Sequence, residues 1–382
     1  MNEEFTRRVN PESLRRELNS SQFVELWFHT FIFFESNARI SSSKLNAFGV
    51  FEVIVDSHAH IVPQTFFDAA KKVADQLPSV KMTETPLGFT FSFAKGETTR
   101  PVTTKLTDTK SRLQWMDSQG IDHQVVGGWL DFFGYELPDQ EGLLWSRLIN
   151  QHLFYDIKDQ DRITGLATVP LQNGKLAAQV LNEALDSGFA GAMIGTQPKG
   201  KGGNLDDEDL DDFWEVASNR GAVIFIHPMF VCGDDRLADY ELIQTVGRTN
   251  DTTVAIARLL SSGHILKYSG VKIILSHGGG SLPFVLGRLA KNYAMNPTKV
   301  ADPCAGMHKL YFDTVVFDPD TLKFLIDKFG SDRVLMGSDY PFALGDLEPR
   351  KVIDSTHLNP LDSERVLGKN AAKIFNIKQC NC

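Results

Sequence analysis

The sequence has little of what marks secreted, membrane-embedded or nucleic-acid-binding proteins. It carries four cysteines in 382 residues, two of them at Cys380 and Cys382, which is too few for a disulfide scaffold and typical of a reducing compartment. No run reaches about 18 consecutive apolar residues, the length that a membrane-spanning helix needs. Acidic residues outnumber basic ones by 48 to 39, and a net charge of −9 argues against binding to nucleic acid. We therefore expect a cytoplasmic protein that binds neither membranes nor nucleic acids.

Glycine motifs that bind nucleotides are also missing. No G-x-G-x-x-G leads from a strand into a helix, there is no Walker loop, and His277-Gly-Gly-Gly280 matches neither motif. What remains is an ordinary globular composition, with 42% hydrophobic and 23% charged residues. A chain of this length can bury a large core without disulfides.

Short apolar runs alternate with helical patterns from Val53 onward. Most of these runs are continuously apolar, which is typical of parallel strands buried on both faces. The eight strand candidates are 53–57, 121–126, 163–168, 189–195, 222–226, 271–276, 310–314 and 333–338. Helical patterns between them include 175–187, 206–219, 252–263 and 320–329. Eight such units predict an α/β fold, a (β/α)8 TIM barrel, with a doubly wound open sheet as the alternative.

Two regions depart from this repeat. Residues 1–52 differ from the rest, so we expect an N-terminal appendage of unknown role followed by a barrel domain at 53–382. The stretch 62–120 is a small insertion after the first strand, in which Thr90–Phe93 and Lys95-Gly96 predict a β-hairpin. Long loops at the catalytic end of a barrel usually form lids or pocket walls.

Histidines and an aspartate stand where the predicted strands end. His58 and His60 follow the first strand, His227 the fifth, His277 the sixth and Asp339 the eighth. The C-terminal ends of barrel strands meet on one face, and residues two apart on a strand point the same way. His58 and His60 can therefore grip one ion, and His227 with Asp339 would complete a set of three imidazoles and a carboxylate that suits Zn²⁺. Each residue alone is more simply a structural hydrogen-bonding group, so the joint pattern is what indicates a metal site.

The order H-x-H, H, H, D on a barrel resembles the amidohydrolase superfamily, and within it the branch of the 2-amino-3-carboxymuconate-6-semialdehyde decarboxylases. The resemblance covers about residues 53–378, with its motifs in order and near-family spacing. The matching stretches are Asp56–His60, Thr99–Val102, Arg112–Asp117, Ile226–Pro228, Ser276–Ser281 with Gly287-Arg288, and Met336–Phe342 through Gly345–Pro349. It implies a barrel of the metal-dependent hydrolase type.

The same resemblance implies roles for the histidines and the aspartate. His58, His60, His227 and Asp339 would bind one divalent ion, Zn²⁺, and His277 would be the acid/base that activates a water on that ion. Such a histidine can shuttle a proton near neutral pH.

Two arginines complete the implied site. Arg100 would hold a substrate carboxylate, and Arg288 would do the same by reaching into the neighbouring subunit of a homodimer. The planar fork of an arginine matches a carboxylate, although either residue taken alone is more simply a surface ion-pair partner.

Other positions bear on the metal count and the substrate. The fourth strand, Gly191–Gly195, has no lysine to bridge two metals, which favours a single ion. Met229 and Phe230 stand where the resembled enzymes have tryptophan and aspartate, so the substrate can differ. Trp129 and Tyr135, after the second strand, either line a pocket for a planar ring or are ordinary packing, and the sequence leaves both interpretations open.

The combined pattern predicts an O₂-independent decarboxylase (carboxy-lyase) that uses one Zn²⁺. Its substrate would be a small carboxylated aromatic or ring-cleavage product such as an aminocarboxymuconate semialdehyde. The alternative is a metal-dependent hydrolase of a C–C or C–N bond, or a hydratase, because these reactions need the same metal, water and base. A catalytically inactive binding barrel is disfavoured by the full set of ligands together with His277.

Overall fold

A computed structural model of the chain describes residues 53–94, 96–200, 202–229 and 234–378. The predicted N-terminal appendage at 1–52 lies outside these residues, so that prediction is untested. Among the described residues, no helix combines the length and the apolar character needed to span a membrane.

Eight parallel strands form a closed ring at the centre of the fold. They are β1 (Val55–Ile61), β4 (His123–Gly128), β5 (Ile163–Gly165), β6 (Gly191–Gly195), β7 (Val223–His227), β8 (Lys272–Leu275), β9 (Leu310–Asp313) and β10 (Val334–Leu335). Regular pairing gives one sheet in the order β1-β4-β5 and another in the order β10-β9-β8-β7-β6. Parallel bridges between Ala167 and Ala192 and between Ala59 and Tyr340 join the two sheets at both seams. The predicted barrel is confirmed.

Helices follow the strands and cover the outside of the ring. The main ones are α5 (Thr109–Gln119), α6 (Asp139–Ile157), α7 (Gly174–Asp186), α8 (Asp211–Asn219), α9 (Arg248–Ser261), α11 (Leu282–Met295) and α13 (Pro319–Phe329). After β10 come α14 (Pro349–Ser355), α15 (Pro360–Glu364) and α16 (Asn370–Ile374), and the short α10 (His264–Lys267) and α12 (Pro303–Met307) flank β8 and β9. N-capping side chains fix where some of these helices begin. The Asp108 carboxylate caps α5, and the Asn173 amide oxygen caps α7.

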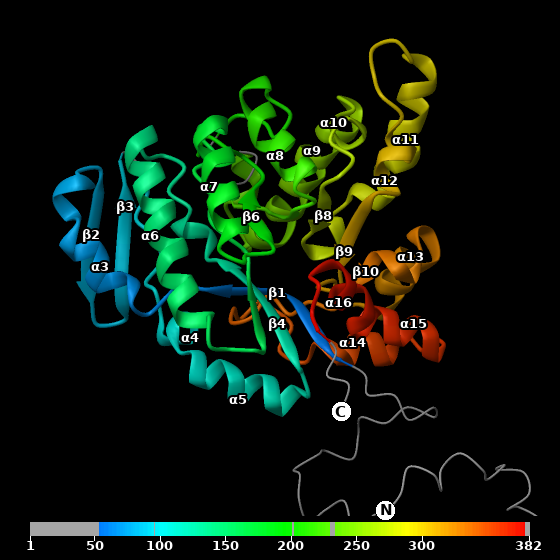
Figure 1. Cartoon of the computed structure of the whole chain (residues 1–382). Coiled ribbons are helices and arrows are strands. Elements are labelled where there is room, and N and C mark those ends of the chain that lie inside the picture. The colour runs from blue at the N-terminus through cyan, green and yellow to red at the C-terminus, as the bar shows by residue number, and fades with distance from the viewer. Residues whose placement is uncertain (1–52, 95, 201, 230–233, 379–382) are drawn as a thin grey trace, which may run out of the picture. The chain divides into compact units, whose positions relative to one another are not determined.

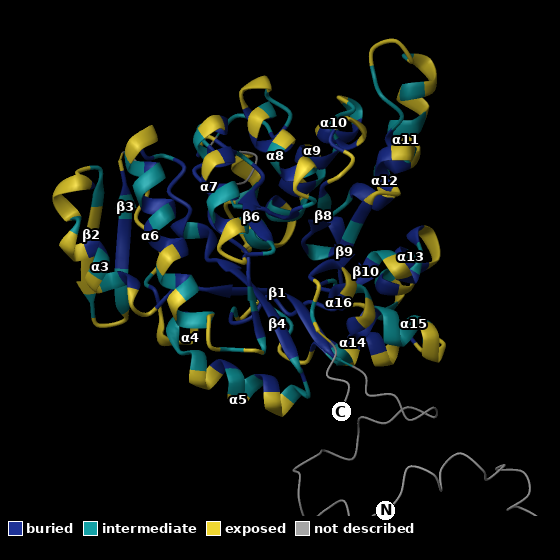
Figure 2. Cartoon of the chain, viewed as in Figure 1, coloured by how far each residue is buried: buried dark blue, intermediate teal, exposed yellow. Residues whose placement is uncertain are grey.

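Burial explains why most strands of the ring have continuously apolar sequences. Figure 2 shows the strands of the ring buried, while the outer faces of the helices are exposed. Every residue of β1, β6 and β7 is buried, because one face points into the barrel and the other packs against helices. The helices bury one stripe each, as α7 does with Ala177, Val180, Leu181 and Ala184.

The insertion after β1 forms a small unit of its own at one side of the barrel (Figure 1). It contains α3 (Phe66–Lys72), the antiparallel pair β2 (Val80–Thr85) and β3 (Gly88–Phe93), and α4 (Thr104–Thr107). Thr90–Phe93 falls in β3 as predicted, but the main partner of β3 is β2, which precedes it. Aromatic side chains hold the unit against α6, with the Phe66 ring 5.0 Å from Trp145.

Candidate metal centre

The C-terminal ends of β1, β7, β8 and β10 bring the five predicted residues together. One ligand atom from each of His58, His227, His277 and Asp339 lies within 4.8 Å of the others. His60 joins them, because its Nε2 lies 3.2 Å from His58 Nε2 and 2.9 Å from Asp339 Oδ1. The structure thus brings these side chains together on one face of the barrel.

The contacts within this cluster are those of groups aimed at a common ion. Asp339 Oδ1 is close to two histidines, yet it makes no hydrogen bond of acceptable geometry with a described residue. His227 Nε2 is likewise buried and unbonded. Buried polar atoms without partners are rare in native proteins, and a bound ion would give these two atoms a partner. The donor set of imidazole nitrogens and a carboxylate therefore fits one divalent metal.

The protonation states also suit metal binding. Burial lowers the pKa of His60 and puts that of His227 well below its usual value, so both imidazoles are neutral and keep a lone pair. Burial alone would raise the pKa of Asp339, but the charge of His58 and the nearby ring nitrogens of His227, His277 and His60 hold it well below its usual range. Neutral imidazole and ionised carboxylate are the forms that bind a cation.

His277 occupies a different place from the other three histidines. His58, His60 and His227 approach Asp339 Oδ1, at 3.4, 2.9 and 3.9 Å, whereas His277 Nε2 approaches Oδ2, at 3.5 Å. Its side chain is 16% exposed, against 0 to 3% for the others. Both His277 and Asp339 have positive φ, 53° and 56°, an unusual conformation that clusters at functional sites.

Residues behind the histidines hold them in place, and the sequence analysis did not identify these residues. Asp313, the last residue of β9, accepts a hydrogen bond from His58 Nδ1 at 2.6 Å and another from the backbone N–H of Gly278 at 2.9 Å. This carboxylate leaves His58 Nε2 free to face the ion and also anchors the turn that carries His277. Its position at the end of a predicted strand was the available signal.

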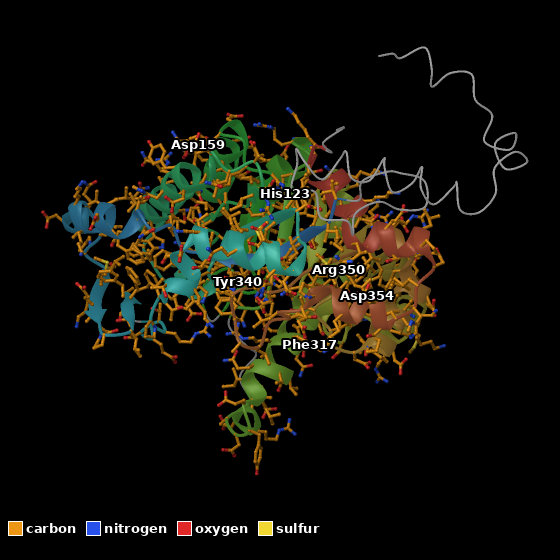
Figure 3. The ribbon with its side chains drawn as sticks, turned by 90° about the horizontal axis from the view of Figure 1, so that it is seen from below. His123, Asp159, Phe317, Tyr340, Arg350 and Asp354 are labelled. Carbon is orange, nitrogen blue, oxygen red and sulfur yellow. The ribbon has the colours of Figure 1, made fainter. Side chains whose placement is uncertain are left out.

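A buried arginine supports the other side of the site. Arg112 donates to the backbone oxygen of His60 at 2.5 Å and to Gln124 at 2.7 Å, and its guanidinium lies over the Tyr340 ring. Tyr340, which is labelled in Figure 3, in turn stacks on Trp115 of α5. The centroids of the two rings are 4.2 Å apart. Burial lowers the pKa of Arg112 to about 10, which leaves it charged at neutral pH.

The cluster opens into a cavity of about 720 Å³. Arg100 lies on its wall, 53% exposed, with Nε and Nη2 both donating to Asp131. A second arginine, Arg248 of α9, lines the same cavity and was not singled out from the sequence. Much of the remaining wall is apolar and is made by Leu130, Val315, Phe324, Leu325 and Phe342.

Three further predicted residues lie off this wall. Trp129 is buried and lies beneath Arg100, whose guanidinium is 5.4 Å from the ring. Tyr135 is buried in the core, where its hydroxyl accepts from the Gly195 N–H and burial raises its pKa. Arg288 is exposed on α11 and does not line the cavity. Their contacts with substrate remain predictions.

Comparison with known proteins adds to this geometry. The Amidohydrolase family model matches residues 144–377. The chain is 30% identical over 338 residues to a 2-amino-3-carboxymuconate-6-semialdehyde decarboxylase from Dictyostelium discoideum, which covers 85% of this chain and 91% of that protein.

Solved structures share the fold. The 5-carboxyvanillate decarboxylase from Sphingomonas paucimobilis superposes with a TM-score of 0.72 at 21% identity, covering 85% of this chain and 99% of that one. A dihydroxybenzoic acid decarboxylase from Polaromonas, with bound manganese, gives a TM-score of 0.71 at 21% identity and covers 86% and 98% of the two chains.

Proposed function

This chain belongs to the amidohydrolase family, and from that premise we propose that it is a single-metal, O₂-independent decarboxylase of a small carboxylated aromatic or ring-cleavage compound. It is a metal-dependent carboxy-lyase of that family. We further propose that the metal is Zn²⁺ and that the substrate belongs to this class of compounds. One observation carries it: the His/Asp cluster opens onto a cavity that has arginine on one wall and apolar side chains on another.

The cavity suits a flat acidic molecule. Phe342, Phe324 and Leu325 offer apolar surface to a ring or a conjugated chain. Arg100 still has an amino group beyond the two N–H groups that donate to Asp131, so it can bind a carboxylate as well. The substrate would then lie with its body on the apolar wall and its reacting carbon toward the histidines.

The protein residues would act on the proton and on the orientation of the substrate. A divalent metal held by His58, His60, His227 and Asp339 would supply a Lewis acid that polarises a substrate oxygen. The C–C bond to the carboxylate breaks, CO₂ leaves, and the electron pair stays on the substrate carbon. His277 would deliver a proton from Nε2 to that carbon and recover one from solvent.

Zinc is proposed from the donor set. Three imidazole nitrogens and one carboxylate match the ligands that Zn²⁺ prefers, although the Polaromonas relative holds manganese. Metal-free protein can be loaded with one equivalent of either ion and assayed side by side. Higher turnover with Zn²⁺ supports the assignment, and higher turnover with Mn²⁺ overturns it.

The reaction is tested by measuring CO₂ release from a panel of carboxymuconate semialdehydes and hydroxybenzoates. The control is His277→Ala protein with the same metal content. Release that depends on His277 supports the proposal. No release from any member by metal-loaded protein would overturn it, and hydrolysis or hydration of ring-fission products and lactones would then be assayed.

We also propose a homodimer in which Arg288 reaches the neighbouring cavity. Arg288 is exposed on α11 and is therefore available to a second copy of the chain. A monomer in analytical ultracentrifugation at assay concentration would exclude this arrangement.

A further inference from the structure

Two arginines of the same chain face the cavity, and they differ in how they are held. Arg100 is half exposed and has two of its N–H groups committed to Asp131. Arg248 is the first residue of α9 and is partly buried. Its Nε donates to Gln244 at 2.7 Å and its Nη1 to the Pro228 oxygen at 2.8 Å. No described residue accepts a hydrogen bond from its Nη2 amino group, so this group is available to a ligand.

We propose that Arg248 binds a second carboxylate of the substrate, one that the reaction does not remove, and so makes the enzyme selective for dicarboxylates over monocarboxylates. The inference rests on the proposed function and narrows its substrate class.

Arg248 has both acidic and basic neighbours. Burial lowers its pKa, the carboxylates of Asp131, Asp339 and Asp251 raise it, and the charge of Arg100 lowers it. These carboxylates have other partners, because Asp131 pairs with Arg100, Asp339 belongs to the metal cluster, and Asp251 accepts hydrogen bonds from Thr196 and Gln197. A ligand carboxylate at Nη2 would therefore give this partly buried cation a direct anionic partner.

The guanidinium is also held in advance of binding. Gln244 belongs to η5 (Ile243–Gly247), one turn before Arg248, and its side-chain oxygen fixes Nε. The Pro228 oxygen fixes Nη1 as well. The Arg248 side chain therefore loses little conformational entropy when a ligand binds at Nη2.

A purely structural role makes a different prediction. The Pro228 oxygen that accepts from Arg248 also lies 3.0 Å from His227 Nδ1. Arg248 could therefore act only by orienting a metal ligand. In that case its loss would lower the metal content and weaken every ligand equally.

The test uses two probes that differ by one carboxylate, isophthalate and benzoate. Their binding to the metal-loaded full chain is measured by calorimetry for wild type, Arg248→Gln and Arg248→Lys. Arg258→Gln is the matched control, because Arg258 lies on the same helix but pairs with Asp206 outside the cavity. Metal content is measured for each protein.

Wild type should bind isophthalate roughly 10- to 100-fold more tightly than benzoate, the range for a charge-assisted hydrogen bond. Arg248→Gln should lose that difference while keeping its affinity for benzoate and its metal. Arg248→Lys should retain part of it, and Arg258→Gln should behave as wild type.

Two results would overturn the inference. One is a wild type that binds isophthalate no better than benzoate. The other is an Arg248→Gln protein that loses metal or weakens both probes equally. Neither result depends on CO₂ release, so a protein that keeps the binding preference but releases no CO₂ would contradict the decarboxylase proposal alone.

Discussion

Replacing Asp313 by asparagine tests whether the Asp313 carboxylate sets which ring nitrogen of His58 carries the proton. The carboxylate is fully buried and accepts from His58 Nδ1, Gly278 N and Val315 N at 2.6, 2.9 and 3.1 Å. An asparagine keeps the shape and can keep the two backbone contacts through its amide oxygen. Its NH₂ group would then face His58 Nδ1, which would have to accept a hydrogen bond and move the imidazole proton to Nε2. That is the nitrogen that faces the cluster.

The expected effect follows from this change of tautomer. Loss of such an outer partner typically lowers metal affinity about 10- to 100-fold. That corresponds to about 1.4–2.8 kcal/mol of metal-binding free energy. The wild-type contact is short and involves a charged acceptor, so we expect the upper half of the range.

The assay is competition for Zn²⁺ against a chromogenic chelator, with thermal unfolding of the metal-free proteins as a check on folding. Asp318→Asn is the control, because Asp318 caps α13 a few residues further on and contacts no metal ligand. The reasoning would be refuted if Asp313→Asn bound Zn²⁺ as tightly as wild type. It would also be refuted if Asp318→Asn lost as much affinity.

Three further outcomes are expected. His277→Ala should lose at least about 100-fold in turnover, which is the contribution of a general acid. Its metal content should stay at one ion, because His277 faces the Asp339 oxygen that points away from the other histidines. Loss of the metal would make His277 a ligand. Mixed dimers of Arg288→Ala and His277→Ala subunits should regain activity, because one of their two cavities has both residues, and mixing without recovery would exclude the cross-subunit role. Burial and the nearby charge of Arg162 lower the pKa of His123 to about 4. The unfolded chain therefore binds more protons than the folded chain between about pH 6.5 and 4. The free energy of unfolding should fall as the pH drops through that window, by at most about 3 kcal/mol. His123→Gln should flatten the dependence of the free energy of unfolding on pH there, and an unchanged slope in denaturant titrations would contradict this.

The metal cluster was predictable because barrel geometry turns sequence positions into neighbours. Once eight strands are recognised, their C-terminal ends share one face, whatever the loops between them do. His58 and His60 are two apart on β1, and His227 and Asp339 follow other strands, so their convergence needed no knowledge of packing. The lack of a lysine in β6 was equally readable.

The residues that only the tertiary structure revealed are those whose roles depend on loop and helix placement. The sequence analysis did not single out Asp313, and only the arrangement of β9 and β1 in the barrel brings its carboxylate into contact with His58. Arg248 starts a helix, and only the packing of α9 over the barrel puts its guanidinium in the cavity. The sequence left Tyr135 open between lining a pocket and ordinary packing, and only the structure places it in the core.

The sequence by itself determined the strand order, the closed barrel and the convergence of His58, His60, His227, His277 and Asp339, because these follow from periodicity and from the polarity of strands. The tertiary structure alone decided which arginines face the cavity and which carboxylate orients His58. Those contacts join residues far apart in the chain, such as Asp313 and His58, and the conformations of the loops between them are not encoded in any local pattern.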